Sequence, residues 1–199
     1  NITIGNRVTS IGRDVFYNTG YYNDESNWEN GVLYIGKYLI IAKTGITSCT
    51  VKAGTLCIAD SAFSDCSSLQ SITLPDGVTV IGDYAFSGCS SLQNITLPDS
   101  VTKIGYEAFF GCKALENVDG FVIIRNTLYN YYGDATVVTV PDGVIVIGAF
   151  AFSGDEKFEK FLDFSQKENI DYCEWNKEEY CGNPCSYYSS DSACQLFYV

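Results

Sequence analysis

A repeat of 23 residues constrains the fold of this chain more than any other feature of its sequence. Residues 67–89 (SSLQSITLPDGVTVIGDYAFSGC) and 90–112 (SSLQNITLPDSVTKIGYEAFFGC) are nearly identical neighbours, and weaker copies begin at Ile2, Cys49 and Val138. The same spacing relates two sets of equivalent residues, Phe63, Phe86 and Phe109, and Cys66, Cys89 and Cys112. One copy is too short to bury its own apolar side chains, so we expect the copies to stack into a solenoid with continuous side-chain columns.

Each copy predicts two short apolar elements separated by turns. Leu69, Ile72 and Leu74 form an LxxIxL strand, which Pro75 to Gly77 end, because proline cannot donate to a ladder and glycine tolerates positive φ. Val78 and Ile81 form the second element, and the following Ala-Phe pair suits a short helical or 3₁₀ turn. Stacked strands of this kind predict a parallel sheet with a spacing of about 4.8 Å.

Two longer insertions interrupt the repeat and resemble each other at a spacing of 89 residues. Residues 30–45 (NGVLYIGKYLIIAKTG) align with 119–134 (DGFVIIRNTLYNYYGD). Each contains two β-prone runs separated by two turn residues, which predicts a β-hairpin. We therefore place hairpin-like inserts near residues 17–48 and 118–137.

Composition excludes several classes of function. The net charge is −12, so the surface repels phosphate, and we expect neither nucleic-acid binding nor attraction to an anionic membrane. The chain has no histidine, which removes Ser-His-Asp triads, Cys-His proteases and HExxH zinc sites. No apolar run approaches the ~20 residues that cross a bilayer, so membrane insertion is not expected. We expect no enzyme activity, cofactor or metal.

The unit LxxITLPDxVTxIGxxAFxxCxxL resembles the BspA-type leucine-rich repeat of bacterial and protist surface proteins. The two inserts are similar to those of gut-bacterial members. The resemblance covers roughly residues 1–154. It implies a fold between α/β and mainly β, in the form of a right-handed leucine-rich-repeat solenoid with a parallel sheet on one face. It also implies a surface-exposed role in adhesion or host contact, and no catalysis.

The end of the chain departs from this pattern. From Asp155 onward there are ten acidic and four basic residues, and beyond residue 164 no repeat is visible. We predict a solenoid domain at 1–160 and an acidic, Cys-rich cap or extension at 161–199. In a secreted protein the cysteines of this extension predict two disulfides with three possible pairings, and a zinc site is the alternative, although paired CxxC spacings are missing. These cysteines are Cys173, Cys181, Cys185 and Cys194.

The remaining cysteines belong to the repeats. Cys66, Cys89 and Cys112 predict a buried column of small apolar side chains. Cys49 occupies the position of Ile72 and is expected in the core as well. Cys57 occupies a position where a later copy has Lys103, so we expect it to be partly exposed.

Two sets of residues are candidate ligand contacts. Strand alternation turns one threonine of each copy outward, at Thr3, Thr50, Thr73, Thr96 and Thr139, and the last four are the candidate contacts, although threonine also serves simply as a solvent-facing strand residue. Aromatic residues of the inserts, Trp28, Tyr129 and Tyr131, are candidate anchors for a protein or glycan, and packing over the solenoid edge is the alternative use.

The leading hypothesis is a non-enzymatic, extracellular leucine-rich-repeat module. It would be secreted or held at a bacterial cell surface, and it would bind a protein or glycan of a host or neighbouring cell as a monomer. A passive spacer or scaffold that presents another domain is the second hypothesis. A glycosidase that uses two carboxylates is the third, and a shallow sheet without a cleft argues against it.

Overall fold

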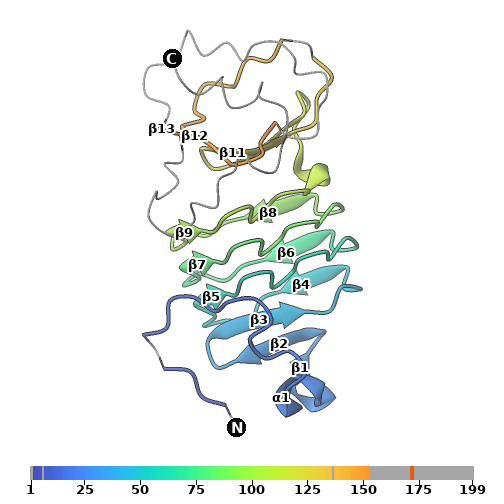
Figure 1. Cartoon of the computed structure of the whole chain (residues 1–199), viewed down its shortest axis with the longest axis vertical. Helices are drawn as coiled ribbons and strands as arrows, with labels where there is room; N and C mark the ends of the chain where they lie inside the picture. Colours follow the sequence, from blue (N-terminus) through green and yellow to red (C-terminus); the bar gives the residue numbers. More distant parts are fainter. Residues whose placement is uncertain (1, 6, 136, 153–170, 173–199) are drawn as a thin grey trace, which may run out of the picture.

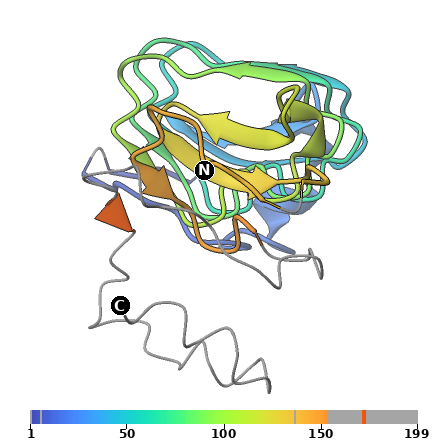
Figure 2. The ribbon, with the colours of Figure 1, turned by 90° about the horizontal axis from the view of Figure 1, so that it is seen from above.

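The computed structural model describes residues 2–5, 7–135, 137–152 and 171–172, and it shows an elongated stack of coils (Figure 1). Seen along the stack, the outlines of successive coils superimpose (Figure 2). The solenoid that the 23-residue repeat predicts is therefore confirmed.

Each of the three central repeats contributes one strand to each of two ladders. The first ladder is a three-stranded parallel sheet of β4 (Ser48–Thr50), β6 (Ser71–Thr73) and β8 (Asn94–Thr96). The second joins β5 (Cys57–Ile58), β7 (Val80–Ile81) and β9 (Lys103–Ile104), also in parallel. The predicted parallel sheet is present, and the second apolar element of the repeat, which we expected only as a short segment, forms a parallel ladder of its own.

Both predicted hairpins are present, and each extends the second kind of ladder. Strand β2 (Val32–Ile35) pairs antiparallel with β3 (Tyr38–Ala42), and β10 (Phe121–Ile124) pairs antiparallel with β11 (Thr127–Tyr131). Leu39 of β3 then lies opposite Ile58, and Leu128 of β11 lies opposite Ile147 of β12 (Val146–Ile147), at the same 89-residue offset. Strand β13 (Asp171–Tyr172) pairs in parallel with β12 at the edge of a separate four-stranded sheet, whose order is β10, β11, β12 and β13.

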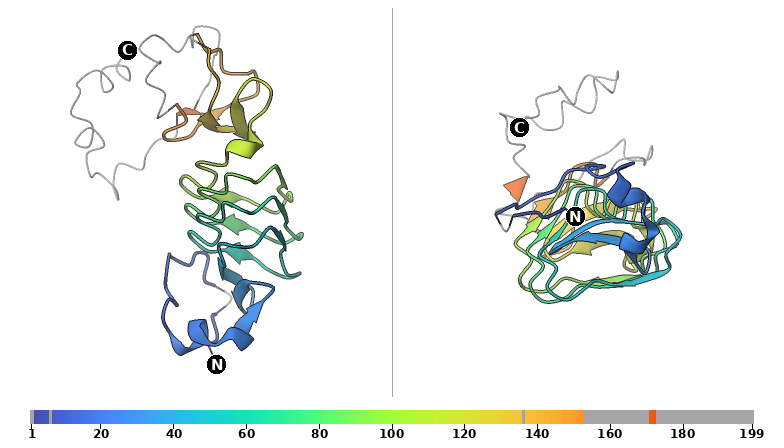
Figure 3. Two further views of the ribbon diagram at one scale, coloured as in Figure 1. Left: turned by 90° about the vertical axis from the view of Figure 1, so that its right-hand side faces the viewer. Right: turned by 90° about the horizontal axis from the view of Figure 1, so that it is seen from below.

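The first insert contains a further hairpin that the sequence analysis missed. A helical turn α1 (Gly20–Asn23) and a 3₁₀ turn η1 (Glu25–Asn27) lead into β1 (Trp28–Glu29), which pairs antiparallel with β2. Asn30 and Gly31 connect the two strands with φ of 51° and 79°, the type I′ geometry that Asn-Gly favours. A second 3₁₀ turn, η2 (Lys113–Leu115), follows the last full repeat. Figure 3 shows the first insert at one end of the stack and the second insert at the other, seen from the side.

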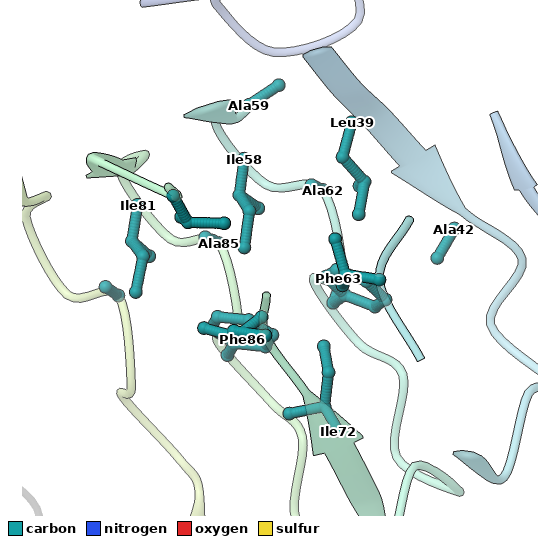
Figure 4. Close-up of a cluster of buried hydrophobic side chains, with 14 of the residues drawn as sticks. Leu39, Ala42, Ile58, Ala59, Ala62, Phe63, Ile72, Ile81, Ala85 and Phe86 are labelled. Atoms are coloured by element: carbon teal, nitrogen blue, oxygen red, sulfur yellow. The ribbon is translucent and has the colours of Figure 1, made fainter. Parts of the chain in front are cut away.

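Columns of equivalent side chains fill the space between the ladders. Phe63, Phe86 and Phe109 are fully buried, and their rings stack at centroid distances of 5.1 and 5.3 Å with interplanar angles of 12° and 8°. Figure 4 shows Phe63 and Phe86 side by side in neighbouring coils, near the equivalent pairs Ala62 and Ala85 and Ile58 and Ile81. Dispersion between rings and removal of apolar surface from water thus repeat at every coil.

The cysteine predictions have different outcomes. Cys66, Cys89 and Cys112 form the predicted buried column, and Cys49 packs against the core while remaining partly accessible. The prediction for Cys57 is wrong, because the N-terminal segment covers it and its thiol lies 3.9 Å from the carbonyl oxygen of Thr9. The extension cysteines, Cys173, Cys181, Cys185 and Cys194, and most of the predicted domain at 161–199 lie outside the described residues.

Candidate functional site

The outward side of the β4, β6 and β8 sheet is a regular polar surface, which we call the hydroxyl face. Register places Ser48, Ser71 and Asn94 in one row and Thr50, Thr73 and Thr96 in the next. All six side chains are exposed, and the residue between each pair points into the core. The outward orientation predicted for the threonines is confirmed, and Thr139 is exposed as well, outside this sheet.

The hydroxyl face carries no charge although the chain has a net charge of −12. Each row offers hydroxyl or amide groups at the strand spacing of about 4.8 Å. Since hydroxyls and amides both donate and accept hydrogen bonds, this surface can meet neutral polar groups at regular intervals without electrostatic repulsion.

Trp28 is half-buried and holds the first insert together. Its indole Nε1 donates to the carbonyl oxygen of Tyr22 at 2.8 Å, and the Tyr22 ring meets it edge-on at 5.3 Å. Lys43 covers the indole from 5.0 Å and forms an ion pair with Glu25. The ring thus packs over the solenoid edge, which was the alternative to ligand contact.

Tyr129 and Tyr131, the other two candidate anchors, are buried, which agrees with packing, the alternative to ligand contact. Tyr129 is 9% exposed, and its ring closes the phenylalanine column by meeting Phe109 edge-on at 5.2 Å. Tyr131 is 6% exposed and packs against Phe121 at 4.8 Å and Phe152 at 6.0 Å. The second insert uses these rings as core where the repeat is interrupted.

A hollow of about 380 Å³ lies beside the free edge of β4, and we call it the edge groove. The β1–β2 hairpin forms one wall and β4 the other. Tyr34 lies at its base, where burial raises the pKa of the phenol to about 12 and its oxygen accepts from the amide of Lys52 at 3.3 Å. Burial raises the pKa of the Cys49 thiol to about 11. The lining residues are Glu29, Asn30, Val32, Tyr34, Ser48, Cys49, Thr50 and Lys52.

The sequence analysis did not predict the edge groove, although the dipeptide Asn30-Gly31 signals the hairpin that forms its wall.

The sequence analysis also did not predict a second cluster of side chains on the surface. Tyr84 and Tyr106 pack edge-to-face at 5.4 Å on one corner of the stack, next to Glu107, whose carboxyl pKa is raised by burial. Tyr84 and Glu107 both have positive φ, at 55° and 46°, a backbone conformation that non-glycine residues rarely adopt.

Nearby carboxylates connect neighbouring coils through hydrogen bonds to the main chain. Asp60 Oδ1 accepts the main-chain amide of Asp83 at 2.9 Å, and Asp83 Oδ1 accepts that of Tyr106 at 2.8 Å. Burial raises the pKa of the Asp60 carboxyl. Each carboxylate satisfies a main-chain donor of the next coil, and this use is structural.

Metal binding and membrane insertion receive no support from the described part of the chain. No group of three or more Cys, Asp or Glu side chains there is arranged to hold a metal ion. Within the same residues, none of the helices is both long and apolar enough to cross a membrane.

The fold and the repeat together define a leucine-rich-repeat solenoid. The family described as "BspA type Leucine rich repeat region" matches residues 1–116 with six copies. The chain belongs to this BspA-type leucine-rich repeat family, as its sequence motif indicated. None of the curated proteins matches it.

Two solved structures of bacterial proteins resemble the chain. A leucine rich cell surface protein from Faecalibacterium prausnitzii A2-165 is 33% identical over 50% of this chain and 31% of its own, with a TM-score of 0.40. A leucine-rich repeat protein from Bacteroides ovatus ATCC 8483 is 31% identical over 61% of this chain and 29% of its own, with a TM-score of 0.35. The match therefore spans about a third of either protein.

Proposed function

We propose that this chain is a non-enzymatic, extracellular binding module that mediates adhesion at a bacterial surface. Its ligand is a protein or glycan of a host or neighbouring cell, which it contacts through the hydroxyl face as a monomer. Membership of the BspA-type repeat family supports this role.

The observation that carries the proposal is the uniform chemistry of the hydroxyl face. Six exposed, uncharged, hydrogen-bonding side chains stand in register on three strands of a rigid sheet. The strands are fixed by the stacked core, so a ligand that aligns with the rows loses freedom only on its own side. Exposed threonines also suit any solvent-facing strand, so a direct binding measurement is needed.

A screen of the purified full chain against extracellular-matrix proteins and arrayed glycans tests the proposal. We expect saturable binding, and we expect Thr73→Lys to weaken it at least tenfold. The substitution places a long, charged side chain at the centre of the uncharged hydroxyl face. Thr102→Lys is the matched control, since it adds the same charge to an exposed threonine outside the face. Equal loss in both variants, or none in either, would contradict the face as the site. Failure to bind anything in the screen would favour the passive spacer.

A further inference from the structure

The hydroxyl face ends abruptly at β4, because the first insert takes the place of the next strand. Register runs from β8 through β6 to β4, and in the part of the chain that the structure describes no strand pairs with the other side of β4. The amide of Val51 donates to Thr73 on β6 at 2.9 Å. Because main-chain groups alternate along a strand, those of Ser48 and Thr50 point the opposite way, toward the edge groove.

The size of the edge groove matches a short piece of extended chain. Its volume of about 380 Å³ falls within the range of about 300–1,000 Å³ that is typical of ligand sites. The open edge is three residues long, which corresponds to about 10 Å of strand. Asn30, in the turn between β1 and β2, also lines the groove.

The lining specifies an uncharged occupant with an apolar residue at its centre. Cys49 is only half-buried, whereas its equivalent Ile72 is 5% exposed, because the column of central residues stops at Cys49. Val32 and the ring of Tyr34 extend this apolar base. At the rim, Lys52 Nζ lies 2.7 Å from the Glu29 carboxylate, so the two charges compensate each other and attract neither cations nor anions.

We propose that the edge groove binds an extended, uncharged peptide segment of a partner protein, which adds a strand to the free edge of β4. Main-chain donors and acceptors that alternate at strand spacing are a property of polypeptides and not of glycans, so the open edge selects a peptide. The central apolar side chain covers Cys49, and polar residues on either side extend the two rows of the hydroxyl face. The chain's own strands, Ser71–Thr73 and Asn94–Thr96, have this polar-apolar-polar pattern.

The test uses the ¹⁵N-labelled full chain and a synthetic peptide with blocked ends whose sequence, QNITL, copies residues 93–97. We expect saturable shifts of the amide signals of Ser48, Cys49 and Thr50. In the register of the other strands, the amide of the peptide isoleucine faces β4 and that of its threonine faces solvent. N-methylation of the isoleucine therefore weakens binding about tenfold or more, and N-methylation of the threonine changes it less than about twofold.

Two variants separate this site from the hydroxyl face. Thr50→Pro removes the amide that points into the edge groove, and we expect it to abolish peptide binding. Thr73→Lys alters the hydroxyl face alone and leaves peptide binding unchanged, so this proposal and the proposed function can fail independently. Absence of shifts at millimolar peptide, or equal affinity of the two N-methylated peptides, would overturn the proposal. The peptide pair decides the question even if Thr50→Pro does not fold.

Discussion

Truncation of a ring in the middle of the phenylalanine column should destabilise the whole solenoid. Phe86 is fully buried and stacks on Phe63 and Phe109 at 5.1 and 5.3 Å. Replacing it with alanine removes about 150 Å² of the apolar surface that folding buries. At about 25 cal/mol per Å², this loss lowers the free energy of unfolding by ~4 kcal/mol. Loss of two ring contacts, at about 0.5–1.5 kcal/mol for each pair, adds at least about 1 kcal/mol more, so the total reaches or exceeds the upper end of Phe→Ala losses of about 3–5 kcal/mol.

The free energy of unfolding is measured by urea titration, followed by far-UV circular dichroism. The free energy of unfolding of a domain is about 5–15 kcal/mol, so Phe86→Ala should remove a large part of it. Phe150→Ala is the matched control, because that ring is 42% exposed and its loss should cost less than about 1 kcal/mol. If Phe86→Ala cost no more than Phe150→Ala, the column would not be the main source of stability.

Three other changes test separate features of the fold. Gly105→Ala should cost about 2–3 kcal/mol in urea titrations, because a Cβ there collides with the main chain of Asp83, whereas Gly45→Ala, with nothing within 4 Å, should stay within about 0.5 kcal/mol. Arg125→Ala should cost about 1 kcal/mol and loosen the second insert in hydrogen exchange, since its guanidinium donates to the carbonyl oxygens of Pro98 and Val101 at 2.8 and 2.7 Å. Burial raises the pKa of the Cys66 thiol from 9.0 to about 12, so under reducing conditions the contribution of this thiol to the free energy of unfolding should be constant below pH 9.0 and fall as pH rises toward 12. Cys66→Ala should reduce that fall, and an unchanged slope would contradict the assignment.

The sign of the alkaline effect follows from proton binding. Between the two pKa values the unfolded thiol has lost its proton and the folded thiol has kept it, so unfolding releases a proton and becomes easier as pH rises. Burial of Cys57 and Cys49, whose thiol pKa values are both raised to about 11, acts in the same direction. The contribution of Cys66 is isolated by comparing the slopes of the variant and the parent chain.

The repeat could be predicted from sequence because every copy must present the same side chains to its neighbours. Phe63, Phe86 and Phe109 stack because their spacing is constant, and the hairpins form because two turn residues separate β-prone runs. The outward direction of Thr73 and Thr96 follows in the same way from strand alternation. These features depend on local pattern and on period, and both are visible in a single sequence.

Features at the ends of the stack could not be predicted because they depend on segments that depart from the period. Cys57 is buried by the N-terminal segment, whose Thr9 is 48 residues away in sequence. Tyr129 is buried because the phenylalanine column needs a closing ring where the second insert replaces a repeat. The edge groove likewise exists only where the first insert displaces a strand.

The two inserts show how a solenoid can gain a binding edge without losing its core. Strands β3 and β11 keep the second kind of ladder continuous with the next repeat, in the same register at an offset of 89 residues. The first insert supplies no strand beside β4, so only the three-stranded sheet is interrupted there. Stability depends on the columns that both ladders enclose, whereas a free sheet edge arises only from the interruption. Both β4 and β8 are edge strands of the three-stranded sheet in the described residues, and beside β4 the first insert also forms the wall of the edge groove. The first insert therefore marks the place where we propose that this solenoid adds a foreign strand.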